Sequence, residues 1–521
     1  MTNQIDRHLD RRALLRGGAG LAVGAGLVAL GACGTGNDPA PSSSGGTPKR
    51  GGTLRWAVAA GNATQIADPA KATGTMPLLI AANCYDTLVR ADAEFNLSPA
   101  LATEWSSTPD ALVWTFKLRA GVKFHDGSAV TAQDVVYSFK RILDPKLAAV
   151  GLGQIGKFLS ASGVSAVDPS TVKITLNKPN AFVPVLVSHA GFSIVKDGTT
   201  DFSKGNGTGP FILNGFDAAA RTSLARFDGY WQDGLPYLDG VEIVVISEDA
   251  TRLQAATSGS QDVVDNITGA STLLLKGNIE PYMLKNGGWV GLTMFGDTAP
   301  FNNPKVIQAM QYAADRKKIM SVVAPGIDII SPDIPIPPSD KYFPTGMTPR
   351  PYDPDRAKAL LKEAGIDGTF NFDVYAYQGD KLDTAISYKS TSEKAGINAN
   401  VITWPHATFF TDIFKKKPAI GISVARLHIS QALPRLYGAT GDLNLTHFSN
   451  ARFDELVAQA TAATDESRQK QLFADALAII NDSAANVIPG WEGQVYGKNK
   501  RVQGLSASNG AHMYLAKAYL A

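Results

Sequence analysis

Hydrophobic residues alternate with polar residues in three short segments of the chain. Residues 54–58 form the first, 114–118 the second and 172–176 the third. A period of two residues is typical of a strand with one buried face, so each segment is a predicted strand. Residues 241–246 form a short, mainly apolar and β-branched run, which predicts a strand buried on both faces.

Apolar positions three and four residues apart mark helices between these strands. Pro304 opens one such segment, and residues 453–460 and 472–480 form two more near the C-terminus. This spacing places apolar side chains on one helix face, and proline is favoured in a first turn. Because strands and helices interleave along the chain, we expect an α/β fold. The proline-rich residues 331–338 are predicted to form an extended connector across the surface.

The first 32 residues have the pattern of an export signal. Arg11 and Arg12 precede an apolar stretch, residues 17–32, which contains six glycines and stops before Cys33. A membrane-spanning helix needs about 20 predominantly apolar residues, so this shorter segment predicts a signal peptide and not a transmembrane anchor. The adjacent arginines indicate the twin-arginine route. The ending Leu-Gly-Ala-Cys resembles the bacterial lipobox, which implies that Cys33 carries a lipid and begins the mature chain.

The composition of the remaining chain excludes a nucleic-acid partner. Residues 33–51 are rich in Gly, Ser, Thr and Pro, which predicts a flexible tether without a hydrophobic core. Without residues 1–32 the chain has 45 basic and 45 acidic residues, so its formal net charge is zero. Nucleic-acid binding requires clustered Lys and Arg, and no basic excess is left to supply them.

Sequence motifs of enzymes, nucleotide sites and metal sites are absent. The chain has no Gly-x-Ser-x-Gly elbow, no His-Glu-x-x-His motif and no phosphate-binding Gly-x-x-x-x-Gly-Lys-Ser/Thr loop. Its seven histidines do not pair at the spacing of helical metal ligands. His125 and Asp126 are adjacent, but Asp126-Gly127 is a turn signal ahead of a helix predicted near Thr131. Cys84 lies among small and apolar residues, which predicts an inert buried thiol. We therefore expect no catalytic residue, no metal and no cofactor.

Several blocks of sequence go beyond these patterns, beginning with Leu-Ala-Thr-Glu-Trp and Val-Lys-Phe-His-Asp-Gly. They are residues 101–105, 114–119, 122–127, 131–135, 207–211, 300–316, 352–365 and 448–489. Together they strongly resemble the family 5 extracellular solute-binding proteins, the dipeptide-, oligopeptide- and nickel-binding components of ABC importers. The match follows the family order through nearly all of residues 52–521.

The resemblance implies a two-lobed α/β clamp with two hinge crossings and mixed sheets flanked by helices. Residues 52–291 with 492–521 would form the first lobe, and residues 292–491 the second. The ligand would lie between the lobes, largely removed from water, and closure would follow from tighter ligand binding to the closed form. The resemblance further implies docking on an ABC permease, and we expect a monomer outside the cytoplasm.

The resemblance also directs attention to the second-lobe segment 420–428. In peptide-binding relatives an Asp in this region pairs with the α-ammonium of the peptide, whereas this segment has no acidic residue. Arg426 instead offers a planar fork that suits a carboxylate or a phosphate. We therefore hypothesise that the ligand presents an anionic or neutral polar group to Arg426 and is not an ordinary free-amino dipeptide. The alternative, a solvent-facing Arg426 at a strand end, stays open.

Further ligand contacts are expected on loops that the family places near its ligand. Trp404 and His406 follow a predicted strand, and Trp404 offers a flat apolar face, although a core or surface role for it stays open. His428 follows Arg426, and a metal role for it with His406 has little support. In the first lobe the expected contacts are Asn62, Thr208 and Gly209, the last of which permits close backbone approach.

These observations predict a lipid-anchored receptor that captures a peptide or a peptide-sized polar solute for an ABC importer. An acidic pocket would favour peptides, an arginine-lined pocket anionic solutes, and stacked aromatic rings sugars. The alternative ligands are an anionic compound, an opine, an oligosaccharide or a nickel chelate. An extracellular hydrolase is the third hypothesis, and no motif supports it.

Overall fold

The computed structural model describes residues 48–59, 67–217, 219–265, 267, 269–327, 329–508 and 512–521. The predicted signal peptide, Cys33, Asn62 and most of the predicted tether lie outside these ranges. Among the helices within them, none combines the length and the hydrophobicity that crossing a lipid bilayer requires.

A ten-stranded mixed sheet has the strand order β14-β13-β15-β12-β16-β11-β1-β10-β9-β8. Its strands are β1 (Thr53–Val58), β8 (Phe211–Phe216), β9 (Arg221–Arg226), β10 (Gly240–Val245), β11 (Val263–Val264), β12 (Ile279–Met294), β13 (Phe370–Ala376), β14 (Ile397–Thr403), β15 (Ala419–Ala425) and β16 (Asn486–Asn499). The parallel pair β1 and β10 aligns Trp56 with Ile243, and both side chains are buried. The strands predicted at residues 54–58 and 241–246 are therefore confirmed.

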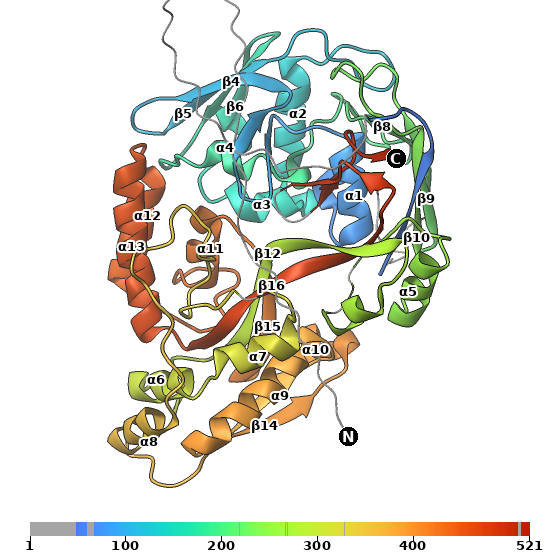
Figure 1. Ribbon diagram of the computed structural model, residues 1–521. Coiled ribbons are helices and arrows are strands. Elements are labelled where there is room, and N and C mark those ends of the chain that lie inside the picture. Colours follow the sequence, from blue (N-terminus) through green and yellow to red (C-terminus); the bar gives the residue numbers. More distant parts are fainter. Residues whose placement is uncertain are drawn as a thin grey trace, which may run out of the picture. The chain divides into compact units, whose positions relative to one another are not determined.

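Two long antiparallel strands, β12 and β16, connect the two lobes (Figure 1). Strand β12 pairs with β15 of the second lobe, and β16 pairs with β11 of the first. We refer to the elements before β12 and after β16 as the first lobe, and to those between them as the second. The pairing changes register between Leu284 and Gly288. A Cβ on Gly291 would lie 2.4 Å from the Val487 carbonyl oxygen, so glycine permits the close approach of the two strands.

The first lobe contains a second, antiparallel sheet of β4 (Ala102–Ser107), β5 (Val113–Leu118), β7 (Thr171–Thr175) and β6 (Val164–Asp168). The predicted strands at residues 114–118 and 172–176 are β5 and β7. Helix α2 (Ala132–Ile142) packs on this sheet and begins with a capping box of Thr131 and Asp134. The other elements are α1 (Thr75–Cys84), α3 (Val150–Ile155), α4 (Val183–Leu186), α5 (Asp249–Thr257), η1 (Pro69–Lys71), η2 (Pro145–Leu147), η3 (Ala161–Gly163), η4 (Ala190–Phe192), η5 (Gly269–Leu274), β2 (Val89–Ala91), β3 (Leu97–Pro99), β17 (Val502–Gln503), β18 (Ser506–Ala507), β19 (Met513–Tyr514) and β20 (Tyr519–Leu520).

The second lobe is mainly helical around its end of the large sheet. Its elements are α6 (Pro304–Tyr312), α7 (Arg316–Val323), α8 (Pro354–Glu363), α9 (Asp380–Ser392), η6 (Glu393–Ala395), α10 (His406–Asp412), α11 (Ile429–Leu436), α12 (Ala451–Ala462) and α13 (Glu466–Ser483). The predicted apolar stripes of α12 and α13 are buried, except that Ile479 is only partly so. They share one core with Trp289 of β12 and Trp491 of β16, so the connecting strands form part of that core.

The proline-rich residues 331–338 are largely buried, and the prediction of a surface connector was wrong. Ile334 is fully buried between the prolines. Asp333 Oδ1 accepts a hydrogen bond from the Ile488 N–H at 2.8 Å, and Asp333 Oδ2 accepts one from Arg316 Nη2 at 2.5 Å. Proline has no N–H to satisfy, so this bent segment lies beside β16 at little hydrogen-bonding cost.

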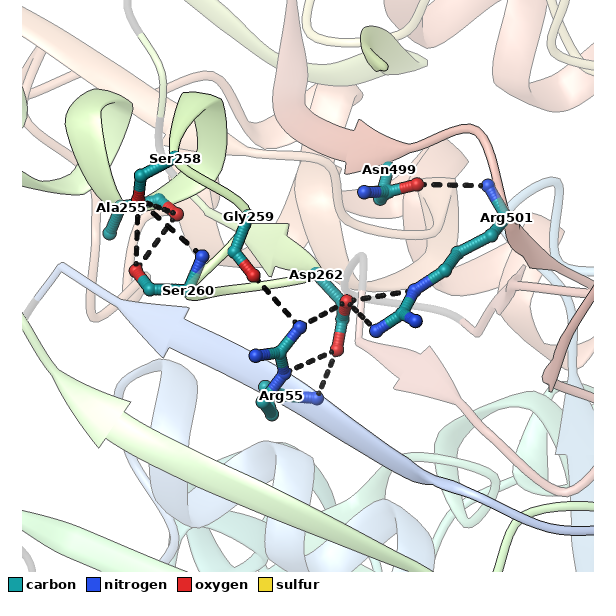
Figure 2. A network of polar contacts seen from close by, with 8 residues as sticks. All are labelled: Arg55, Ala255, Ser258, Gly259, Ser260, Asp262, Asn499 and Arg501. Carbon is teal, nitrogen blue, oxygen red and sulfur yellow. Dashed lines mark hydrogen bonds and ion pairs between the residues drawn. The ribbon is translucent and has the colours of Figure 1, made fainter.

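Asp262, directly before β11, joins three segments of the first lobe (Figure 2). Its carboxylate accepts hydrogen bonds from the backbone N–H and side chain of Arg55 and from the side chain of Arg501. Asp262 is fully buried, while both arginine side chains are partly exposed. Burial alone would raise the pKa of Asp262, but the hydrogen bonds from Arg55 and Arg501 hold this pKa below its usual value.

The lowered pKa of Asp262 predicts a specific loss of stability in acid. The ionised form is favoured by folding, so its contribution is fully present above the usual pKa of Asp, about 4, and is lost as the pH falls through the lower folded pKa. Asp262→Asn is expected to reduce the unfolding free energy at pH 7 and to flatten its acid dependence. Urea unfolding at pH 7, 4 and 3 measures both effects.

The matched control is Asp355→Asn, because Asp355 is 95% exposed in its side chain and its pair with Lys358 spans 3.7 Å. Exposed pairs of this kind contribute about 0–1 kcal/mol, so this variant should follow the wild-type pH profile. Identical profiles for Asp262→Asn and wild type would contradict the role given to Asp262.

Candidate functional site

Strand β15 places Arg426 and His428 directly beyond its last residue, next to the strands that connect the lobes. Gly288 of β12 pairs with Ala425, the last residue of β15. The Arg426 backbone N–H then donates to the Gly287 carbonyl at 2.9 Å. His428 caps the N-terminus of α11. The positions of both side chains are therefore fixed by regular structure on either side.

The Arg426 guanidinium is buried in ion pairs and does not face solvent. Nη1 donates to the Ala93 carbonyl at 2.9 Å and to Glu94 Oε2 at 2.7 Å, and Nη2 lies 3.4 Å from Asp340 Oδ2. The guanidinium carbon lies 5.2 Å from the centre of the Phe95 ring. The solvent-facing alternative is therefore excluded. Because both terminal nitrogens already have carboxylate partners, a ligand anion would have to displace Glu94 or Asp340.

A cavity of about 550 Å³ lies beside these groups and has walls from both lobes. The first lobe contributes Glu94, Phe95 and Phe182, and the second contributes Tyr342 and His428. Other lining residues are Asn96, Leu97, Ser107, Trp114, Ala181, Val185, Asp340, Lys341, Thr464, Glu466 and Gln469. Aromatic walls with polar groups at their edges are typical of ligand pockets.

His428 is a neutral side chain in the wall of this cavity. Its Nδ1 lies 3.3 Å from the Ser430 N–H, which donates to it, so the proton of the neutral ring is on Nε2. Burial, with the charges of Lys341 and Arg426, lowers the pKa of His428 to about 3. The ring offers an N–H donor at neutral pH. Within the described ranges no three or more His, Cys, Asp or Glu side chains gather as metal ligands would.

Trp404 and His406 form a separate group at the far end of β14. The Trp404 indole N–H donates to Thr408 Oγ1 at 3.0 Å, and the ring is partly buried against the second-lobe core. His406 is exposed at the start of α10, with its ring centre 4.7 Å from that of Tyr377. Within the described part of the chain, no hydrogen bond, ion pair or ring contact joins these two residues to Arg426 or His428, so the expected contacts divide into two groups.

Thr208 and Gly209 lie in a packed contact with the end of α1, contrary to the expectation of a ligand-facing loop. Thr208 is fully buried, and its hydroxyl donates to Asp86 Oδ2 at 3.1 Å. A Cβ on Gly209 would lie 2.5 Å from the Asn83 carbonyl oxygen. The close approach that glycine permits here is to the chain's own helix. Cys84 at the same helix end is buried, and burial raises the pKa of its thiol, as expected of an inert cysteine.

A cluster of Asp380, Lys381 and Glu492 was missed in the sequence. Gly288 pairs with Ala425 on one side and with Glu492 on the other, so the Glu492 side chain lies on the same sheet face as the end of β15. Asp380 begins α9 and forms an ion pair with Lys381. The signal that could have revealed it is an acidic residue within the glycine-flanked, otherwise apolar segment 489–493.

The electrostatics of this cluster are unusual because two carboxyl groups share one ammonium. Burial raises the pKa of Glu492 well above its usual value, the nearby Asp380 raises it further, and Lys381 opposes both. Asp380 and Glu492 also raise the pKa of Lys381 against the effect of its burial. A cationic group placed beside these carboxyls would therefore stabilise the ionised form of Glu492.

Comparison with known proteins agrees with this architecture. Residues 96–432 match the family model described as bacterial extracellular solute-binding proteins, family 5 Middle. The chain is 28% identical over 445 residues to the glutathione-binding protein GsiB of Shigella boydii serotype 4 (strain Sb227), covering 81% of this chain and 86% of that protein.

Solved structures share the same two-lobed fold. The periplasmic binding protein DppA from Helicobacter pylori, in complex with the peptide STSA, has a TM-score of 0.77 at 24% identity and covers 91% of this chain and 98% of its own. The ABC transporter substrate-binding protein CtaP from Listeria monocytogenes has a TM-score of 0.80 at 22% identity, covering 91% of this chain and 100% of its own.

Proposed function

The chain belongs to family 5 of the bacterial extracellular solute-binding proteins, and we propose that its ligand is a peptide or a peptide-sized polar solute with a cationic amino group. Members of this family are the extracytoplasmic solute-binding components of ABC importers and not enzymes, and they work with ABC permeases. GsiB is by name a glutathione-binding protein, and glutathione is a tripeptide with a free ammonium.

The observation that carries the proposal is a second carboxyl group, that of Glu492, beside the strands that connect the lobes, which would ionise if a cation were placed against it. Asp380 and Glu492 share Lys381, so one carboxyl group lacks a cation of its own. A ligand ammonium removed from water needs a carboxylate partner, because a buried unpaired charge is costly. Glu492 would supply this partner in place of the acidic residue that segment 420–428 lacks.

Arg426 gives the hypothesis of an anionic ligand no comparable support. Its two terminal nitrogens already bind Glu94 and Asp340. Among the other expected contacts, Trp404 and His406 would contact the ligand on one side, and His428 would donate from the cavity wall. Asn62 stays a predicted contact from the first lobe. Thr208 and Gly209 would act only through packing.

The attachment to the membrane and the lobe boundaries belong to the same proposal. Cys33 would carry a lipid after removal of residues 1–32, with residues 33–51 as the tether and the twin-arginine route for export. Residues 52–291 with 492–521 would form the first lobe and residues 292–491 the second. The mature protein would act as a monomer, because one lipid and one body suffice to present a ligand to a permease.

Native mass spectrometry of the protein extracted gently from membranes tests the proposal. The expected spectrum shows a chain that begins at Cys33 with added acyl mass, and one retained ligand of peptide size per chain. Incubation with a defined mixture of di- and tripeptides should exchange that ligand without cleavage of any peptide. Cleaved peptides, or a retained sugar or nickel chelate, would contradict it.

A further inference from the structure

Four polar contacts recorded in the described part of the chain connect the two lobes away from β12 and β16. Two are uncharged: the side chains of Gln431 and Gln154 bind each other, and the Ala181 N–H donates to the Thr461 carbonyl. In the third, the Lys157 ammonium donates to the Thr440 carbonyl. The fourth, between Arg426 and the Ala93 carbonyl with Glu94, is the one ion pair between the lobes within the described ranges.

Arg426 is held in place by the connecting strand β12 and by Asp340 of its own lobe before it reaches the body of the first lobe. Its backbone N–H donates to Gly287 on β12, and Asp340 pairs with Nη2. The Arg426 and Asp340 side chains are each only 5% exposed. The remaining terminal nitrogen, Nη1, is thereby directed at the first lobe. Little side-chain freedom is left to lose when that contact forms, which favours its formation.

The acceptor in the first lobe is a rigid turn between β2 and β3. Asp92 Oδ1 accepts hydrogen bonds from the backbone N–H groups of Glu94, at 2.8 Å, and Asn96, at 2.9 Å. Phe95 has a φ of 63°, in the left-handed region, and its ring lies against His428. The turn thus presents the Ala93 carbonyl and the Glu94 carboxylate together.

The distribution of charge makes this contact reversible. If the lobes separate, Asp340 still compensates the charge of Arg426, so no unpaired buried charge is created. The Glu94 side chain is 44% exposed already, so water can replace Arg426 around it. The contact therefore breaks at a modest cost, unlike a fully buried ion pair.

The Arg426 backbone also connects this contact to the place where β12 changes register. Gly287, which accepts the Arg426 N–H, lies within the irregular pairing between Leu284 and Gly288. A change in the angle between the lobes that bends β12 there would move Arg426 relative to Glu94.

We propose that Arg426 is a positioning residue for closure, whose contact with Ala93 and Glu94 sets the fraction of ligand-free protein that is closed, without touching the ligand. The inference rests on the proposed function only in that closure serves ligand capture. Apparent affinity scales with the closed fraction, so a weaker contact lowers affinity by the same factor as it lowers that fraction.

The test is single-molecule energy transfer between labels on Val167→Cys and Val322→Cys, one in each lobe. Both positions are exposed, whereas Cys84 is buried and stays unlabelled. In ligand-free protein, Glu94→Gln is expected to lower the closed fraction about three- to tenfold at low salt, and high salt should remove the difference from wild type. The exposed Glu94 is replaced first because Arg426→Ala would leave Asp340 buried without a partner. Arg426→Lys should keep only part of the wild-type closed fraction, since lysine lacks the planar fork of arginine.

The matched control is Glu363→Gln, which breaks the Lys305–Glu363 pair of 3.1 Å within the second lobe and should leave closure unchanged, because the Glu363 side chain is 44% exposed, as that of Glu94 is. An unchanged ligand-free distribution in Glu94→Gln would overturn the inference. Loss of glutathione affinity in Glu94→Gln without a change in that distribution would also overturn it, by indicating a direct ligand contact. The energy-transfer measurement is made on ligand-free protein. A failure of the proposed peptide binding would therefore leave the inference about closure standing.

Discussion

Asp333→Asn is expected to lower the free energy of unfolding by about 3–5 kcal/mol, the usual effect of removing one partner from a buried ion pair. Asp333 is fully buried and its partner Arg316 nearly so. Burial raises the pKa of Asp333 against the effect of Arg316, so the carboxylate depends on this partner to remain ionised. Without it, the Arg316 charge stays in the core uncompensated. Chemical denaturation monitored by tryptophan fluorescence measures the loss.

Asparagine is the better replacement because Asp333 has a φ of 61°. Asn tolerates this left-handed conformation, whereas Ala would add backbone strain to the loss of charge. Combining Asp333→Asn with Arg316→Met should recover much of the loss, because the double variant leaves no charge in the core. Equal destabilisation in the single and double variants would contradict the ion-pair explanation.

The control is Asp482→Ala, which removes the Arg350–Asp482 pair at 3.3 Å. The Asp482 side chain is 74% exposed. Its loss should cost about 0–1 kcal/mol. Comparing the loss of unfolding free energy in Asp333→Asn and in Asp482→Ala separates the effect of burying an ion pair from the effect of having one.

Glu492→Gln is expected to weaken binding of a free-amino peptide by about 30-fold or more. Loss of one partner of a desolvated charge pair costs about 2–5 kcal/mol, and about 1.4 kcal/mol corresponds to tenfold. Protonated Glu492 forms a side-chain hydrogen bond with Asp380. The amide of Gln keeps the shape of the side chain and can donate the same bond. Isothermal titration calorimetry with glutathione measures the change, with Glu280→Gln on the first-lobe side of β12 as control.

The same substitution should not reduce stability, which separates binding from folding. A carboxyl group with a raised folded pKa is favoured in its protonated form, so its contribution is full below the usual pKa of Glu and is lost as the pH rises through the raised value. Gln stays neutral, so Glu492→Gln should unfold at the same temperature as wild type or above it. A lower Tm together with weaker binding would indicate a structural role instead.

Single strands and helices of this protein were predictable from the sequence because their hydrophobic positions follow the regular periods of strands and helices. The alternation at residues 114–118 and the apolar run at 241–246 correspond to β5 and β10, and Thr131 begins α2 as its turn chemistry indicates. Each of these depends on neighbours within a few residues. The proline-rich segment failed because its burial depends on β16, about 150 residues away.

The candidate site was less predictable because its groups meet through strand register. Glu492 lies beside the end of β15 only because Gly288 of β12 pairs with both strands. The partners of Arg426 come from Glu94 and Asp340, which are remote in the sequence. The local sequence could suggest an anion site at Arg426, but the charge of Arg426 is neutralised by these distant residues.

The most direct test of the central claim compares peptides that differ only in the charge of their amino terminus. An equimolar mixture of tripeptides, each present with a free and with an acetylated amino group, is offered to the wild-type protein and bound species are read by native mass spectrometry. The account predicts that the free-amino peptides bind at least about 30-fold better, from the cost of an unmade charge pair. Equal occupancy by acetylated peptides, or retention of anionic solutes alone, would contradict it.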